Sequence, residues 1–376
     1  MFINNHSISP SNVVRGEGAW IDSLDLITKL CKRPLIIGRS SSTKKIRTSF
    51  KKDLLLKGIQ SISLDLDHDC CELDIQNAYL ISKHNNCDGI IAAGGGKVLD
   101  AGKLIADLLG INCITVPLSA STCAGWTALS NIYTPDGKFV KDVTLKSCPN
   151  LLIFDHTIVR NAPPRTLASG MADAVAKWYE SSLTSSSSQD GFVQQAVQMA
   201  RVLRDQLFLN GQKAFLDPLS NSWETVAEGC ALTAGIIGGL GGARCRTAAA
   251  HPIHNGLTQL AYTNKPLHGE LVGFGLLVQL HLEEKNSNSQ LPKQAKSQLL
   301  EFFSQLNLPI SIESICLRNT TSNELHIACK FACNDDSDIH KLPFPINEKD
   351  LLEAIQSLQS LPTSSKINKI HKRVIQ

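Results

Sequence analysis

Short, continuous apolar runs alternate with helix-like stretches through the first 155 residues of the chain. Runs of four to six such residues are typical of strands that are buried on both faces of a parallel sheet. The five predicted strands are residues 34–38, 62–66, 89–93, 111–116 and 151–154. Amphipathic helices are predicted between them at residues 22–30 and 100–109. This β–α alternation predicts a doubly wound α/β domain with a parallel sheet.

The pattern changes after Pro163 and Pro164. Before them, the turn-forming sequence Pro135-Asp136-Gly137 predicts a hairpin across residues 131–143. Beyond them helical periodicity prevails, and we expect an all-helical second domain. Its predicted helices are residues 173–180, 192–207, 223–235, 271–284 and 351–358, with a serine-rich bend at 184–188. A length of 376 residues fits two domains, which we place at residues 1–160 and 161–376.

Charge and composition exclude several classes of partner. Lys and Arg total 37 against 34 Asp and Glu, so the net charge of +3 argues against a nucleic-acid partner. The uncharged, glycine-rich stretch at residues 229–243 is too short to span a bilayer, and the N-terminus lacks the apolar run of a signal peptide. We therefore expect a cytoplasmic protein without a membrane partner. Its 12 scattered cysteines form no CxxC pair and are expected to be small buried residues in a reducing compartment.

Two loops follow predicted strands and carry residues suited to a phosphorylated ligand. Gly94-Gly95-Gly96-Lys97 lies between a strand and a helix, where free backbone N–H groups and the helix dipole favour a pyrophosphate. Pro117-Leu118-Ser119-Ala120-Ser121-Thr122 places hydroxyl groups at the same edge of the sheet. The alternatives are a tight βα turn for the first loop and an ordinary polar loop for the second.

Three segments of the helical half carry candidate metal ligands. They contain Asp173, the pair His251 and His254, and His268. The two histidines at i and i+3 share one face of a helix, and His268 opens another helical stretch. One carboxylate with two or three imidazoles suits Zn²⁺ or Fe²⁺. Without further context, three histidines among 11 could equally be structural.

Taken together, these motifs resemble the iron-containing alcohol dehydrogenase superfamily, and within it the glycerol dehydrogenases. GGGKxxD, SAST, GMADA, AHPIHNG and LHGE occur in the family's order, and the resemblance extends from Val14 to Pro343. It implies a dinucleotide-binding α/β domain, a helical C-terminal domain and a metal in the cleft between them. The implied metal ligands are Asp173, His251 and His268.

The resemblance also implies a cofactor site and a reaction. Gly95, Gly96 and Lys97 fall on the pyrophosphate turn. The rest of the cofactor is lined by Leu118, Ser121, Thr127, Leu129 and Tyr133. The metal polarises the substrate oxygen while hydride passes between carbon and nicotinamide. His254 matches a family histidine thought to relay the proton, a structural role being the alternative. The family is often oligomeric, so a homo-oligomer is expected.

One departure from glycerol dehydrogenases concerns the cofactor. They commonly carry an acidic residue for the adenine ribose after the strand at residues 34–38, where this chain has Arg39 followed by Ser40. An acid there repels a 2′-phosphate, whereas an arginine with hydroxyl groups accepts one. We therefore predict a preference for NADP(H) over NAD(H). The alternative is a solvated basic loop.

Two further departures concern the substrate. Cys123 replaces the aspartate expected to contact the substrate, and a thiol cannot accept hydrogen bonds from a polyol as a carboxylate does. Glycerol itself is therefore doubtful. Arg244 and Arg246 stand where a glycine-rich acidic segment is usual, and one of them could bind a carboxylate or phosphate. The alternative for both is a surface or interface position.

These features predict a metal-dependent NAD(P)(H) oxidoreductase that interconverts a small polyol or alcohol with its ketone or aldehyde. A polyol-phosphate dehydrogenase of the glycerol-1-phosphate type is an alternative that Arg244 or Arg246 would favour. A dehydroquinate-synthase-like lyase is another, although its relatives carry Glu where this chain has Asp173. A nucleotide-binding regulator without activity is disfavoured because all three implied metal ligands are present.

Overall fold

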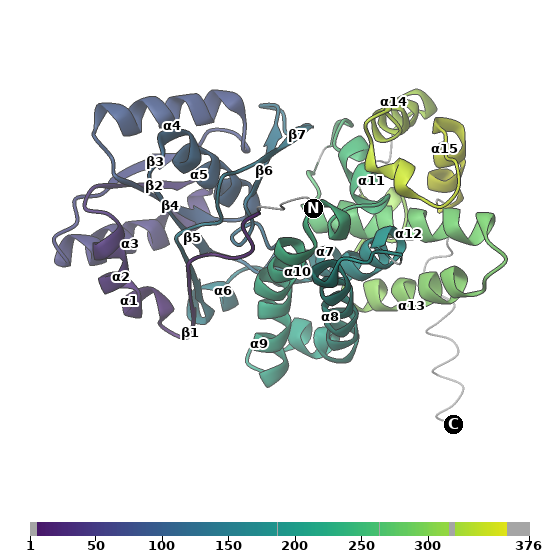
Figure 1. Cartoon of the computed structure of the whole chain (residues 1–376), viewed down its shortest axis with the longest axis horizontal. Coiled ribbons are helices and arrows are strands. Elements are labelled where there is room, and N and C mark those ends of the chain that lie inside the picture. Colours follow the sequence, from purple (N-terminus) through teal and green to yellow (C-terminus); the bar gives the residue numbers. More distant parts are fainter. Residues whose placement is uncertain (1–5, 186, 263, 316–319, 359–376) are drawn as a thin grey trace.

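The N-terminal half is built on a six-stranded parallel sheet (Figure 1). The computed structural model describes residues 6–185, 187–262, 264–315 and 320–358, apart from the side chains of residues 243 and 244. The strand order is β1-β8-β5-β4-β2-β3. The strands are β1 Asn12–Gly16, β2 Pro34–Gly38, β3 Ile62–Asp65, β4 Gly89–Gly94, β5 Asn112–Pro117 and β8 Leu151–Asp155. All five predicted strands are confirmed, whereas the short edge strand β1 was not predicted.

Helices cover both faces of this sheet. They are α1 Ala19–Asp22, α2 Leu24–Leu30, α3 Lys44–Leu56, α4 Glu72–His84, α5 Gly96–Leu109 and α6 His156–Arg160, with a 3₁₀ turn at Ser41–Thr43. The helix predicted at residues 100–109 is confirmed within α5. The single helix predicted at residues 22–30 is wrong in its start, because Ser23 separates α1 from α2.

Alternating strand residues enter two separate cores. Leu35 and Ile37 of β2 pack with Leu99 of α5 on one face. Ile36 packs with Phe50 of α3 on the other. Successive side chains of a strand point to opposite faces, so continuous apolar runs are what a sheet covered on both sides requires.

The predicted hairpin is confirmed as an antiparallel pair, β6 Leu129–Tyr133 and β7 Phe139–Thr144. It projects from the sheet toward the helical half (Figure 1). Phe139 N–H donates to Thr258 Oγ1 over 2.9 Å, so the hairpin is tied to the helical half.

After Asp155 the described residues contain helices and no strand, as expected for the second domain. The helices are α7 Pro164–Ser185, α8 Gly191–Leu216, α9 Asn221–Glu228, α10 Ala234–Gly241, α11 Ala250–Leu257, α12 His268–Asn286, α13 Leu291–Gln305, α14 Ser322–Ala332 and α15 Glu348–Ser357. 3₁₀ turns occur at Gly242–Cys245, Glu313–Ile315 and Asp338–Lys341.

Two expectations for this half need correction. The helix predicted at residues 223–235 is interrupted, because a π-helical turn at Gly229–Thr233 joins α9 to α10. The bend predicted at residues 184–188 begins too early, since α7 continues through Ser185. Residue 186 of that stretch lies outside the described residues.

The two halves share a hydrophobic core. Leu152 and Phe154 of β8 belong to the same buried cluster as Met171 of α7 and Leu276 of α12. Trp126, in the loop after β5, also joins this cluster, and its Nε1 donates to the Ile8 carbonyl over 3.1 Å. This shared core and the Trp126 contact hold the two halves in a fixed relative position.

Two expectations drawn from the composition concern membrane-spanning helices and the cysteines. None of the helices in the described part is long and apolar enough to cross a bilayer. Each described cysteine is free, and all but Cys87 and Cys333 are buried. Cys316 lies outside the described residues.

Candidate active site

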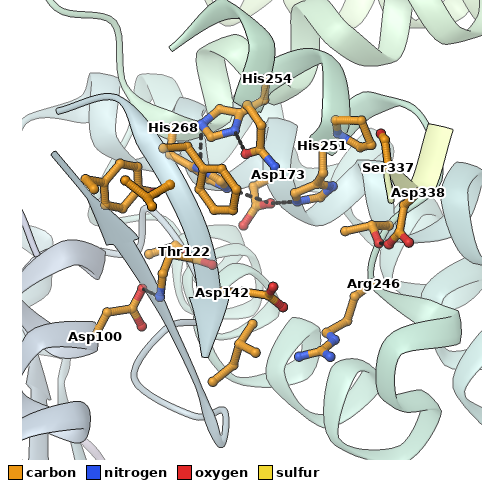
Figure 2. Close-up of a pocket in the computed structure, with 18 of the residues that line it drawn as sticks. Asp100, Thr122, Asp142, Asp173, Arg246, His251, His254, His268, Ser337 and Asp338 are labelled. Atoms are coloured by element: carbon orange, nitrogen blue, oxygen red, sulfur yellow. Dashed lines mark hydrogen bonds and ion pairs between the residues drawn. The ribbon is translucent and has the colours of Figure 1, made fainter. Parts of the chain in front are cut away.

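A cavity of about 410 Å³ lies between the sheet and the helices (Figure 2). One wall comes from the loop after β5, including Thr122 and Cys123, and from the β6–β7 hairpin. The opposite wall comes from α7, α11 and the start of α12, with Ser337 and Asp338 at one side. The end of the second predicted cofactor loop, at Thr122, and the predicted metal ligands thus line one space.

Asp173, His251 and His268 converge on the floor of this cavity. They come from α7, α11 and α12, and each offers a ligand atom within 4.8 Å of the others. Asp173 Oδ1 lies 3.4 Å from His251 Nε2 and 3.6 Å from His268 Nε2. Metal–ligand bonds of about 2.1 Å in a tetrahedral site place neighbouring ligand atoms about 3.4 Å apart. The spacing therefore suits a zinc or iron ion.

The surroundings of Asp173 also call for a cation. Its Oδ1 is buried and has no hydrogen-bond partner among the described residues. Burial opposes ionisation, but Lys177 and the two histidines hold the pKa of Asp173 well below its ordinary value. An ionised, buried oxygen without a donor is costly. A metal ion at this point would remove that cost, so the residues present fit such a group.

Glu180 completes the site and was missed by sequence reasoning. It is fully buried, and its Oε2 lies 2.6 Å from Nδ1 of His251. Burial works against a charged imidazole, but Glu180 raises the pKa of His251 in the metal-free protein to about 9. A carboxylate on one ring nitrogen leaves the other directed at a metal. Glu180 lies two helical turns after Asp173 on α7, so the two carboxylates share one face of the helix. That spacing is the sequence signal from which Glu180 could have been predicted.

His254 lies behind His268 rather than beside Asp173. Its Nε2 is 3.0 Å from His268 Nδ1, and its Nδ1 is 2.8 Å from Asn255 Oδ1. With His268 Nε2 turned to the metal position, His268 Nδ1–H donates to His254, whose own Nδ1–H donates to Asn255. Burial, with His268 nearby, keeps the pKa of His254 well below its usual range. His254 is therefore a neutral imidazole that orients His268.

Close backbone packing brings these three helices together. A Cβ on Gly269, next to His268, would overlap the Ser169 carbonyl of α7. A Cβ on Gly275 would come within 2.5 Å of the Ala250 carbonyl of α11. Only glycine permits such approaches, and both fix α12 against the helices that carry Asp173 and His251.

The glycine-rich turn is placed as predicted, at the start of α5. Gly95 is the N-cap residue and Gly96 the first helical residue. A Cβ on Gly96 would lie 2.6 Å from the Thr122 methyl group, whereas the space beside Gly95 is open. Leu118 N–H donates to the Gly94 carbonyl over 3.0 Å, which joins the two predicted cofactor loops. Ser121 lies in the second of these loops, with its Oγ 3.1 Å from Ser119 Oγ.

Asp69, another residue missed by sequence reasoning, pairs with three cations beside the predicted pyrophosphate turn. It is buried and forms ion pairs with Lys97 over 2.6 Å, with Lys265 over 2.8 Å and with Arg39. Burial acts to raise its pKa, but Lys97 and Lys265 outweigh that effect and lower the pKa to about 2. Ser40 lies beside this cluster, where its Oγ caps the following turn.

Thr127, Leu129 and Tyr133 line the cavity, as predicted for cofactor contacts. The buried Lys103 fixes this wall. Its Nζ donates to the Thr127 carbonyl over 3.0 Å and to the Leu129 carbonyl, and it pairs with Asp100 over 2.9 Å. Every donor of Lys103 therefore has an acceptor.

Of the three residues predicted to contact the substrate, two have described side chains. Cys123 and Arg246 line the cavity, and Arg246 projects into it (Figure 2). Burial raises the pKa of the Cys123 thiol, which disfavours a thiolate nucleophile. The side chain of Arg244 lies outside the described part of the chain. Lys177, which also lines the cavity, was not predicted.

Comparison with known proteins identifies the class that this fold and site define. The family model described as iron-containing alcohol dehydrogenase matches residues 10–156. An oxidoreductase of Synechocystis is 41% identical over 93% of this chain and 91% of its own length. The chain belongs to the iron-containing alcohol dehydrogenase family.

Within that family, glycerol dehydrogenases are prominent among the similar proteins. The glycerol dehydrogenase of Thermotoga maritima is 33% identical over 72% of this chain and 74% of its own length. The solved glycerol dehydrogenase of Schizosaccharomyces pombe superposes with a TM-score of 0.82 at 28% identity, covering 95% of this chain and 91% of that one. The predicted resemblance and fold class are confirmed.

Proposed function

We propose that the protein is a metal-dependent NAD(P)(H) oxidoreductase that interconverts a small alcohol or polyol with its ketone or aldehyde. The observation that carries this function is the Asp173, His251 and His268 cluster, which faces the predicted cofactor wall across one cavity. Zn²⁺ or Fe²⁺ fits its ligand set. When bound, the metal would polarise the substrate oxygen and stabilise the alkoxide form of the alcohol.

The chain's own residues would orient the reactants. Glu180 directs Nε2 of His251 toward the metal position, and His254 does the same for His268. A proton relay through His254 stays a prediction, because both of its ring nitrogens are engaged by neighbouring side chains. The open N-terminus of α5 at Gly95 and Gly96 would take the pyrophosphate, and Lys97 stands beside it.

We infer a preference for NADP(H) from the charges at the cofactor edge. Arg39, Lys97 and Lys265 surround a single carboxylate, Asp69. Three cations and one anion leave an excess of positive charge where the adenine ribose and phosphates are expected. A 2′-phosphate would be attracted to this excess.

The substrate is small and differs from the glycerol named for several relatives. Relatives include glycerol dehydrogenases, a glycolaldehyde reductase of Halobacterium salinarum and a hydroxycarboxylate dehydrogenase of Escherichia coli. Because Cys123 offers no carboxylate to a polyol, we favour small carbonyl compounds, such as aldehydes, ketones and oxo acids, over glycerol.

The expected homo-oligomer also stays a prediction, which light scattering would test.

A metal-reconstitution assay tests the function. The protein is stripped with a chelator, reloaded with Zn²⁺ or Fe²⁺ and assayed for NAD(P)H oxidation with glycolaldehyde, hydroxyacetone and pyruvate. Asp173→Asn should lose the bound metal and at least about 100-fold of the activity, because it removes a charged ligand. The matched control is Asp335→Asn, an exposed change. Full activity of Asp173→Asn, or turnover in the absence of metal, would refute the proposal.

A further inference from the structure

We propose that this cavity selects small 2-oxo acids and the corresponding 2-hydroxy acids, whose carboxylate is bound by Lys177. The proposal rests on the proposed function and names its substrate class.

Lys177 is a buried cation that lacks a partner. It lies one helical turn after Asp173 on α7, is 5% exposed and lines the cavity. Among the described residues its Nζ has no hydrogen bond and no ion pair within 4.0 Å. The buried Lys103, by contrast, lies behind the cavity wall and binds the carbonyl oxygens of Thr127 and Leu129 and the carboxylate of Asp100. An ammonium group that lines a cavity and has no acceptor from the protein is placed to bind an anionic ligand through a charge-assisted hydrogen bond.

The metal site strengthens the need for an anion. Asp173 is the acidic group that acts most strongly on Lys177. A divalent cation bound by Asp173 would neutralise the negative charge of its carboxylate. Lys177 would then have no nearby counter-charge of comparable strength. A substrate carboxylate would restore the balance.

Arg246 adds a second cation to the wall of the cavity. It projects into the space in Figure 2 and has no hydrogen bond or ion pair in the described part of the chain. Asp142 and Asp336 at the rim are exposed to solvent. Asp338 is already paired with Lys341 over 2.9 Å and accepts from Thr247. The positive charges deeper in the cavity are thus left for a ligand.

Spacing favours a carboxylate attached directly to the reacting carbon. Side chains four residues apart on a helix begin about 6 Å from each other. In a 2-oxo acid the carboxylate oxygens lie about 3 Å from the reacting oxygen, and a charge-assisted hydrogen bond adds about 2.8 Å. One helical turn places Lys177 on the same face of α7 as Asp173, so a carboxylate on the reacting carbon would lie between the metal position and the ammonium group. A phosphate placed farther along the substrate would extend toward Arg246.

The reaction balances with the nicotinamide cofactor as the redox partner. Hydride passes from C4 of NAD(P)H to the carbonyl carbon of R–CO–COO⁻, and the carbonyl oxygen takes one proton from solvent. The products are R–CHOH–COO⁻ and NAD(P)⁺. Lys177 stays protonated throughout and holds the carboxylate, so it is a binding residue for this reaction.

Paired charged and neutral substrates test the assignment in the metal-loaded enzyme. Wild-type kcat/KM should be at least about 10-fold higher for pyruvate than for hydroxyacetone, and higher for glyoxylate than for glycolaldehyde. Lys177→Met should lower kcat/KM for pyruvate by about 10- to 100-fold while changing hydroxyacetone less than about 3-fold, as expected for a charge-assisted hydrogen bond. Lys177→Arg should restore part of this preference. Lys141→Met is the matched control, because Lys141 is an exposed lysine of β7 that does not line the cavity.

Ligand binding gives a readout that does not require turnover. By calorimetry, the loaded wild type should bind oxamate and not the neutral oxamide, and Lys177→Met should lose this distinction. Equal losses for both substrates at unchanged metal content would overturn the proposal, as would a wild-type preference for neutral carbonyls or for dihydroxyacetone phosphate. If Lys177→Met does not fold, the wild-type selectivity and oxamate binding decide. Absence of turnover with every carbonyl would instead refute the proposed function itself.

Discussion

At the scale of single residues, the family resemblance implies the metal ligands but not the groups that support them. Asp173, His251 and His268 each stand in a short, distinctive segment, and the structure brings all three together. Glu180 and Lys177 lie in ordinary helical sequence, and only the packing of α7 against α11 shows what they face. Asp69 could not be predicted because its partner Lys265 is far away in sequence.

Arg39 carries the prediction that belongs to this scale. Arg39→Gln should reduce kcat/KM for NADPH by about 10- to 100-fold, because it removes a charge-assisted hydrogen bond to the 2′-phosphate. The value for NADH should change by less than about 3-fold. Steady-state kinetics with both cofactors measure the effect, and Lys45→Gln, an exposed change in the same basic segment, is the control. A wild type that uses NADH as well as NADPH would contradict the preference.

At the scale of elements, strands that are buried on both faces can be recognised from the sequence, because their residues form continuous apolar runs. β2, β4, β5 and β8 are mostly apolar and buried along nearly their whole length, so they stand out as strands. β1 reads Asn-Val-Val-Arg-Gly and is only partly buried at the sheet edge, so its pattern is too short to stand out. The π-helical turn after α9 leaves helical periodicity in the sequence nearly unchanged, which is why one continuous helix was expected.

The approach of α12 to α7 leads to a prediction about helix packing. Gly269→Ala should lower the free energy of unfolding by about 1–3 kcal/mol, because the added methyl group overlaps the Ser169 carbonyl. The shift should also displace His268 and weaken metal retention. Urea unfolding and metal analysis measure the two effects.

The control for that change is Gly191→Ala, at the start of α8. Nothing lies within 4 Å of the Cβ position of Gly191. This variant should unfold within about 0.5 kcal/mol of the wild type. Equal stability of both variants would show that α12 adjusts without cost.

At the scale of the whole molecule, Asp69 links the two halves through Lys265, while it also pairs with Lys97 of its own half. Its pKa is lowered to about 2 from an ordinary value of 3.8, so its ionised form stabilises the fold. This contribution, about 2 kcal/mol, is fully present above about pH 4 and is lost as the pH falls toward 2.

Asp69→Asn tests this link. At pH 7 the variant should be less stable than the wild type in urea, and the difference should shrink between pH 4 and pH 2. Asp67→Asn, an exposed change two residues away, is the control and should show no such trend. A difference that is constant with pH would mean that Asp69 acts by packing rather than by charge.

The position of β1 has a consequence for how the chain is made. β1 is synthesised before the other strands of this sheet, yet its only neighbour in the described sheet is β8, where Asn12 pairs with Leu151. The nascent strand must therefore wait, unpaired, until most of the N-terminal half has been synthesised. Contacts so distant in sequence form slowly. We expect the sheet to close from β2 and β4 outward, with β1 added last.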